Sequence, residues 1–193
     1  MTLACEAYAQ LQQAGVDQPT HVFLQAGVGS FAAAIMGYCL SNACAAQPRI
    51  VIVEPDQADC LFRSARTADG SAEIVAGSMP TIMAGLACGE PSSVSWPLVR
   101  DHADVLCSAE DRVAADGMRI LASPLPGDPR IVSGESGAVG AGLLYAIMRD
   151  ADLNVMKDTL GLDSSSRVLL ISAEGDTSPD VYRDIVWLGS DCS

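Results

Sequence analysis

The stretch THVFLQAGVGSFAAAIM, residues 20–36, decides the fold expected for this chain. A short apolar run ends at two glycines, and an alanine-rich segment of helical character follows at once. Glycines at positions 27 and 29 let the backbone turn sharply and leave N–H groups free to face an anion. The start of a helix adds its positive end to the same place. The stretch therefore predicts a strand, a tight turn and a helix that together could hold a phosphate.

Three interpretations of this turn stay open on these residues alone. In the first, Gly27, Gly29 and Ala32 form the G-x-G-x-x-A pattern of a dinucleotide site, with Glu54 at the end of the next predicted strand. In the second, the turn holds the phosphate of a smaller cofactor, which needs only the turn and the helix. In the third, it is a tight connection between strand and helix that binds no ligand.

Strand patterns alternate with helical patterns along the rest of the chain. Such alternation, with connections of helical length, is typical of an α/β chain with a mostly parallel sheet and flanking helices. The region 166–172 has the clearest strand pattern, and the tail 180–187 is expected to dock against the body. Strands are predicted at 21–25, 50–53, 103–109 and 166–172, with a short extended piece at 72–77. Helices are predicted at 1–14, 31–45, 57–67 (capped by Asp56), 95–102, 110–123, 133–150 and 151–163, with a short helix inside 80–91.

The charge of the chain excludes one class of partner. Twenty-four acidic residues against eleven basic ones give a net charge of −13. A nucleic-acid backbone is bound mainly by Lys and Arg, so we expect no nucleic-acid partner. No apolar run reaches the roughly 18 residues that span a bilayer, and the N-terminus lacks the basic region of a signal peptide. A cytoplasmic protein with no membrane partner is expected.

The cysteines and histidines give no metal site. Seven cysteines are scattered without a C-x-x-C pair, and the chain has two histidines. This spacing does not match a zinc site, and an odd number of scattered cysteines is typical of reduced, buried thiols. We therefore expect no metal ion.

Two further segments could carry chemistry. The segment SGESGAVG, 133–140, resembles a nucleophile elbow but lacks the second glycine, and both histidines precede Ser136, contrary to the order in that hydrolase fold. Glu135 either faces a ligand or sits near the positive end of a helix. The segment ISAEGDT, 171–177, places Ser172 at the end of a predicted strand, where α/β sheets bind ligands. Ser172 either bonds a ligand there or is structural.

Together, five segments resemble the diaminopropionate ammonia-lyase family. They are THVFLQAGVGS, IVIVEPDQADC, PTIMAGLACGEP, DPRIVSGESGAVG and ISAEGDTSPDVYRDIVW, which cover the chain from about residue 15 to 188. The resemblance implies a pyridoxal-phosphate enzyme of fold type II, the tryptophan-synthase-β and threonine-dehydratase group. It also implies α,β-elimination of 2,3-diaminopropionate, a small amino-acid substrate, to pyruvate and ammonia. A homodimer is implied for the full-length enzyme.

The resemblance implies roles for particular residues. Those implied to bind pyridoxal phosphate are Ala26, Gly27, Val28, Gly29 and Ser30 at the phosphate, Glu135 and Ser136 along the ring, and Ser172 at the pyridine nitrogen.

The resemblance also implies that catalytic groups lie elsewhere. In the family, the lysine that holds the cofactor and the acidic residues that move protons lie in an earlier part of a chain about twice as long. The only lysine here, Lys157, lies in a predicted helix end far in sequence from the glycine turn. We therefore expect residues 1–193 to form a single partial domain, the C-terminal part of the large domain, inactive by itself. The alternatives are a non-catalytic phosphate-ligand-binding module and an NAD-dependent oxidoreductase built on the glycine turn.

Overall fold

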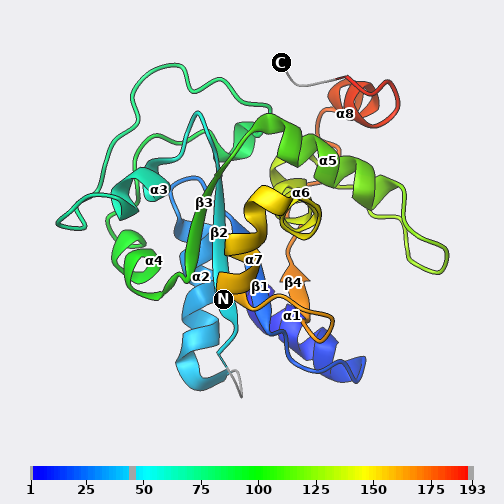
Figure 1. The fold of residues 1–193 in the computed structure, drawn as a ribbon, viewed down its shortest axis with the longest axis horizontal. Helices are drawn as coiled ribbons and strands as arrows, with labels where there is room; N and C mark the ends of the chain where they lie inside the picture. The colour runs from blue at the N-terminus through cyan, green and yellow to red at the C-terminus, as the bar shows by residue number, and fades with distance from the viewer. Residues whose placement is uncertain (1, 44–46, 191–193) are drawn as a thin grey trace.

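The computed structural model describes residues 2–43 and 47–190, and in it a parallel sheet lies between two layers of helices (Figure 1). The strands are β1 (His21–Gln25), β2 (Arg49–Pro55), β3 (Val105–Ala109) and β4 (Val168–Leu170). Their order across the sheet is β3-β2-β1-β4, and every neighbouring pair is parallel. The predicted α/β class, with a parallel sheet and flanking helices, is confirmed.

The two central strands bury both of their faces, because successive side chains of a strand point to opposite sides. One face, with Leu24 and Ile52, packs against the first helices of the chain. The other face, with Phe23 and Val53, packs against the later ones. The first group is α1 (Thr2–Gln13), α2 (Ser30–Tyr38), α3 (Cys60–Ala65) and α4 (Trp96–His102); the second is α5 (Asp111–Ala122), α6 (Glu135–Arg149) and α7 (Asn154–Leu160).

The tail forms one more helix, α8 (Pro179–Val186), and it docks as expected. Tyr182 and Ile185 are buried against Met118 of α5 and Ala138 of α6. Three short helical pieces complete the elements: the π-helical η1 (Cys39–Ala43) and the 3-10 helices η2 (Ala84–Leu86) and η3 (Ala151–Leu153).

The strand predicted at 166–172 is shorter in the structure than its sequence pattern indicates. β4 covers only Val168–Leu170, its side chains are half-buried, and Ser172 lies beyond it in an exposed position. β4 is one of the two edge strands, and in the described part of the chain it pairs with β1 alone. One neighbour instead of two leaves this strand shorter and less buried than its apolar sequence indicates.

Other boundaries also differ from the expectations. α2 ends at Tyr38 and continues as η1, while Cys44 and Ala45 lie outside the described residues. The helix expected from 57 begins at Cys60, and Asp56 does not cap it. The segment 72–77 forms no strand, and the helix expected at 151–163 divides into η3 and α7.

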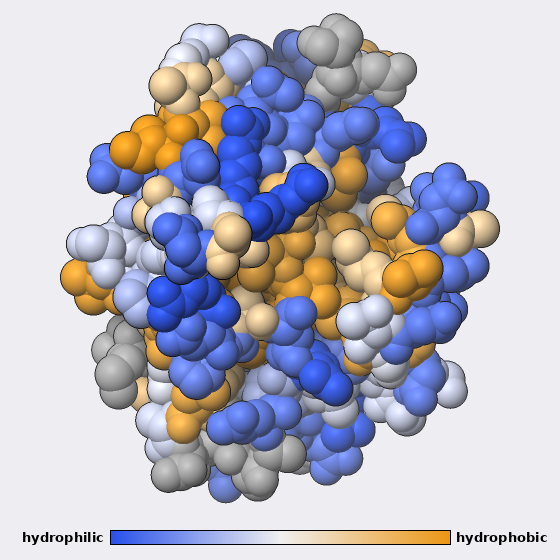
Figure 2. Space-filling view, turned by 60° about the vertical axis from the view of Figure 1, so that its left-hand side comes forward, coloured by the Kyte–Doolittle hydropathy of each residue, from blue (hydrophilic) through white to orange (hydrophobic). Residues whose placement is uncertain are grey.

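The surface shows where apolar residues collect. Figure 2 shows one face on which hydrophobic residues gather in a central hollow with hydrophilic residues around it. Within residues 2–43 and 47–190, no helix is long and apolar enough to span a bilayer.

Candidate functional site

The glycine turn after β1 has a geometry that favours glycine. Gly29 lies just before α2 with φ +89°, a left-handed conformation that L side chains rarely adopt. A Cβ on Gly29 would lie 3.3 Å from a methyl carbon of Leu61. A Cβ on Gly27 would lie 3.0 Å from Cys88 Sγ and 3.3 Å from the carbonyl oxygen of Leu86. The turn therefore presents bare backbone and the first N–H groups of α2, which have no partner within the helix.

A pocket of about 370 Å³ opens beside this turn. It lies at the C-terminal ends of the parallel strands, the edge where α/β sheets bind their ligands. Four stretches of the chain meet there: the end of β1 with the turn, the η2 region, the start of α6, and the segment after β4. The lining residues are Gln25, Gly27, Val28, Gly29, Ser30, Phe31, Gly85, Leu86, Cys88, Ser136, Gly137, Ala173 and Glu174.

A group of hydroxyls lies at the start of α2. Ser95 Oγ is 3.2 Å from Ser30 Oγ and 3.3 Å from Ser92 Oγ. Ser95 is buried and precedes α4, so it joins the starts of two helices. Neither Ser92 nor Ser95 was predicted from the sequence to be a site residue. The predicted helix start at 95 was the one feature that pointed to this place.

The start of α6 is capped by a carboxylate that sequence analysis also missed. Glu174 Oε2 accepts hydrogen bonds from the backbone N–H of Ser136 at 2.7 Å and of Gly137 at 3.2 Å. A carboxylate is stabilised at the positive end of a helix. Gln25 holds the segment before Glu174 in place, since its amide donates to the carbonyl of Ile171 at 2.9 Å. The signal available in the sequence was the acidic turn after the predicted strand.

Three of the expected site residues do not line the pocket. Ala26 is buried, and its N–H donates to the carbonyl of Val53. Glu135 is buried at the start of α6, where burial raises the pKa of its carboxyl, and the charge of Glu174 raises it further. Ser172 is exposed at its side chain beside the pocket, with its Oγ 2.7 Å from Ser133 Oγ. The other five, Gly27 to Ser30 and Ser136, do line the pocket.

Comparison with known proteins places this geometry in a family. A family model described as pyridoxal-phosphate dependent enzyme matches residues 1–158. The chain belongs to this family. It is 55% identical over 190 residues to the diaminopropionate ammonia-lyase of Salmonella typhimurium, covering 98% of this chain and 47% of the relative. It is 47% identical over 188 residues to that of Escherichia coli K12, covering 97% of this chain and 46% of the relative.

A solved structure gives the same result. A crystal structure of the Escherichia coli diaminopropionate ammonia-lyase superposes with a TM-score of 0.88 at 46% identity, covering 98% of this chain and 47% of that one. The resemblance to this lyase and to fold type II is thus confirmed. The chain spans about half the length of the lyases it matches.

The pocket fits the cofactor of this pyridoxal-phosphate family. The bare turn at Gly27 and Gly29 makes a cradle that any Cβ would fill, and the N–H groups of a helix start suit a phosphate. Opposite, Ser136 Oγ is buried without a hydrogen-bond partner. The volume of about 370 Å³ is in the range of small-molecule sites.

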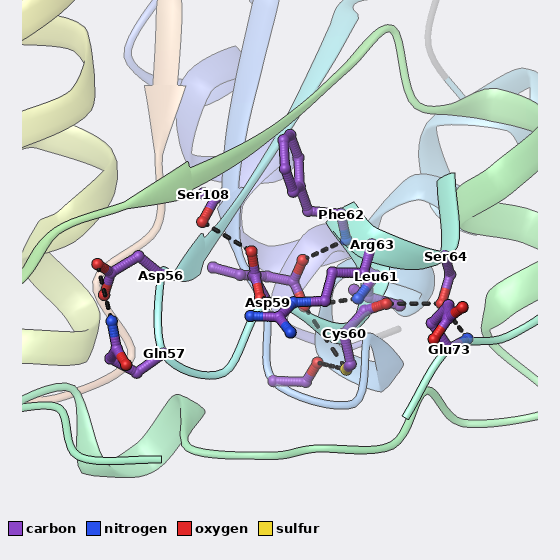
Figure 3. A network of polar contacts seen from close by, with 12 residues as sticks. Asp56, Gln57, Asp59, Cys60, Leu61, Phe62, Arg63, Ser64, Glu73 and Ser108 are labelled. Atoms are coloured by element: carbon purple, nitrogen blue, oxygen red, sulfur yellow. Dashed lines mark hydrogen bonds and ion pairs between the residues drawn. The ribbon is translucent and has the colours of Figure 1, made fainter. Parts of the chain in front are cut away.

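Glu54 is unsuited to the ribose contact of a dinucleotide site. Its side chain is fully buried, and its carboxylate accepts hydrogen bonds from the N–H groups of Leu61 at 2.9 Å and Phe62 at 2.7 Å. The polar network around these residues continues through Asp59, which bonds Ser108 and Arg63 (Figure 3). Burial raises the pKa of Glu54 to about 8, although the two backbone N–H groups lower it. Glu54 serves as an internal cap for α3, so the geometry argues against the oxidoreductase.

Lys157 is not among the residues that line the pocket. It belongs to α7, one turn before Leu160, whose carbonyl is 2.9 Å from His21 Nε2. His21 begins β1, whereas the glycine turn follows the end of β1. Met156, next to Lys157, contacts Cys107 of β3 (Sδ to Sγ 3.9 Å), so α7 lies along one face of the sheet and outside the pocket.

The thiols and possible ligands give no metal centre in the described part of the chain. Cys39, Cys60 and Cys107 are buried, Cys88 is half-buried and Cys5 is exposed. Cys44 and Cys192 lie outside the described residues. No group of three or more His, Cys, Asp or Glu side chains that could hold a metal ion occurs within residues 2–43 and 47–190.

Proposed function

We propose that this chain is the cofactor-binding part of a diaminopropionate ammonia-lyase, which converts 2,3-diaminopropionate to pyruvate and ammonia by α,β-elimination. The observation that carries the proposal is the pocket in which the glycine turn before α2 faces the start of α6. The identity of 55% to a lyase of that name supports the choice of reaction.

The residues of this chain bind and orient in this proposal. The backbone N–H groups at Gly27 to Ser30 bind the phosphate, with the Ser30 hydroxyl held by Ser95. Ser136 faces the ring, and Glu135 supports the start of the helix behind it. Ser172 reaches the ring nitrogen once its side chain leaves Ser133, 2.7 Å away. Pyridoxal phosphate supplies the electron sink that such eliminations need.

The catalytic amine comes from elsewhere in this proposal. Pyridoxal-phosphate chemistry uses a lysine at the cofactor's carbonyl, and Lys157 is not among the residues that line the pocket. We therefore place the lysine in another part of a longer lyase, with residues 1–193 as one partial domain of a homodimer. Sequencing the gene upstream of Met1 tests this: an in-frame lysine-bearing segment supports it, and a stop codon directly upstream contradicts it.

Titration of the chain with pyridoxal phosphate tests cofactor binding. Trp96 follows Ser95 at the start of α4 and is buried, so its fluorescence reports on the phosphate end of the pocket. We expect saturable quenching of this fluorescence, together with a shift of the cofactor's absorbance, and competition by inorganic phosphate. No change in either signal at millimolar cofactor would contradict the proposal.

A non-catalytic module that binds a phosphate ligand is the second candidate. The pocket lining favours it, because none of the residues that line the pocket carries an amine. The upstream gene sequence separates the candidates, since a module that functions alone requires no lysine-bearing segment.

A further inference from the structure

The pocket contains one charged side chain, and that charge is negative. Of the residues that line it, Glu174 carries the one carboxylate, and none is Lys, Arg or His. The thiol of Cys88 is the other titratable group. The phosphate end, at Gly27 to Ser30, offers backbone N–H groups and hydroxyls without any Lys or Arg. A dianionic phosphate ligand therefore meets a carboxylate in the same pocket whose charge the start of α6 offsets in part, and like charges repel strongly where little water screens them.

The carboxylate of Glu174 has bonding capacity left over. Both helix N–H groups bond Oε2, and no hydrogen bond to Oε1 is present among the described residues. Oε1 lies 3.9 Å from the position that a Cβ on Gly85 would take, on the pocket wall. An ionised carboxylate can accept about four hydrogen bonds, so Glu174 can accept further donors from a ligand.

Ser136 adds a second, independent observation at this end of the pocket. Ser136 is 6% exposed and lines the pocket, and its Oγ has no hydrogen-bond partner among residues 2–43 and 47–190. Buried polar atoms are normally paired, and an unpaired one needs an explanation. A Cβ on Gly85 would lie 3.1 Å from Ser136 Oγ. Because glycine has no Cβ, the space beside this hydroxyl stays open.

We propose that Glu174 and Ser136 form a subsite for a protonated nitrogen, which binds the cationic N–H group of a ligand whose phosphate end is held at Gly27 to Ser30. This rests on the proposed function and adds a charge requirement to it. The pocket selects a dipolar ligand, negative at one end and positive at the other. Two sources supply such a nitrogen: the pyridinium of the cofactor, whose one N–H would then bond Glu174 in place of Ser172, or an ammonium group of the diamino acid. Both offer charged N–H donors, which carboxylates bind most strongly.

The test compares Glu174→Gln with the unmodified chain. Glutamine keeps an oxygen that accepts from the start of α6 but removes the charge. We expect Glu174→Gln to weaken pyridoxal phosphate binding about tenfold, the effect of losing one charge-assisted hydrogen bond. Binding of benzyl phosphate, which has no basic nitrogen, should stay unchanged or tighten. Ser136→Ala should weaken pyridoxal phosphate binding in the same direction by less.

Asp176→Asn is the matched control. Asp176 is exposed two residues from Glu174 and does not line the pocket, so the same loss of charge there should change neither affinity. Circular dichroism and inorganic phosphate binding check that each variant folds.

Comparison of the two nitrogen-containing ligands identifies which nitrogen the subsite binds. If Glu174→Gln weakens only 2,3-diaminopropionate, measured with inorganic phosphate present, the subsite stands and serves the substrate ammonium. If neither nitrogen ligand is weakened, or benzyl phosphate is weakened equally, the subsite is overturned while cofactor binding survives. If the unmodified chain binds no pyridoxal phosphate, the proposed function fails as well.

Discussion

Gly29 shows how one backbone angle can control a binding site. Its φ of +89° costs an L residue about 1–2 kcal/mol, and a Cβ would press on Leu61 at 3.3 Å. We expect Gly29→Ala to lower the free energy of unfolding by about that amount and to abolish pyridoxal phosphate binding. Gly15, with φ +66° and open space around it, is the matched control. Gly15→Ala should lower stability by a similar amount in urea denaturation but leave binding unchanged. If both variants lost binding equally, the Gly29 turn would not be part of the binding site.

Glu54 should make the stability of the chain depend on pH. Its pKa is raised from 4.5 to about 8 in the folded chain, so the folded state retains a proton that the unfolded state releases. Its contribution is therefore present below pH 4.5 and is lost as the pH rises to about 8. The slope is at most about 1.4 kcal/mol per pH unit. Urea denaturation at several pH values should show this fall, and Glu54→Gln should flatten it. A variant with an unchanged slope would show that Glu54 is ionised at neutral pH.

Helices α5 and α6 approach closely through glycines, and this contact positions the site. A Cβ on Gly142 of α6 would overlap the carbonyl oxygen of Val113 in α5, and one on Gly117 would overlap that of Ala138. Backbone does not yield as a flexible side chain does, so the helices would have to separate. Because α6 begins at the pocket, such a shift would also move Ser136.

Gly142→Ala should therefore lower the free energy of unfolding by about 2 kcal/mol, the usual effect of overpacking, and weaken cofactor binding. Gly140→Ala in the same helix is the control, because its Cβ would meet Leu170 at an ordinary 3.4 Å. It should be neutral or stabilising, since alanine favours a helix over glycine by about 1 kcal/mol. Thermal unfolding of both variants measures the difference. Equal loss in both would mean that the close contact is unimportant.

The central strand β1 could be predicted from sequence, and of the two edge strands β3 was predicted to within two residues of its start while β4 was predicted too long. β1 was predicted at its observed bounds because its apolar residues are buried on both faces. β4 has a similar apolar sequence but a neighbour on one side only, and sequence does not reveal this. The glycine turn was found because its geometry demands glycine. Glu174 and Ser95 were missed because their roles depend on α6 and α2, which are distant in sequence and meet them only in the folded chain.

At the scale of the whole molecule, β3 and β4 are the two edge strands of the sheet in the described residues, and the edge at β4 borders an apolar groove. β4 bonds β1 on one side, and its other side faces a groove of about 480 Å³ shared with α1. Leu3, Leu11 and Ile171 are among the residues lining this groove. An edge strand with apolar surroundings readily pairs with another chain. A second copy of this chain offers an identical edge.

We expect the chain by itself to associate with a second copy through this edge, as an incomplete sheet would. The net charge of −13 opposes association, so screening by salt should promote it. Light scattering at increasing concentration and ionic strength measures the effect. Leu3→Lys, at a position 40% exposed in the groove, should shift the chain towards a monomer, because it places a charge beside the edge. Val155→Lys, on α7 and 78% exposed, adds the same charge away from the groove and should leave association unchanged. A wild-type chain that stays monomeric in high salt would show that α1 already protects β4.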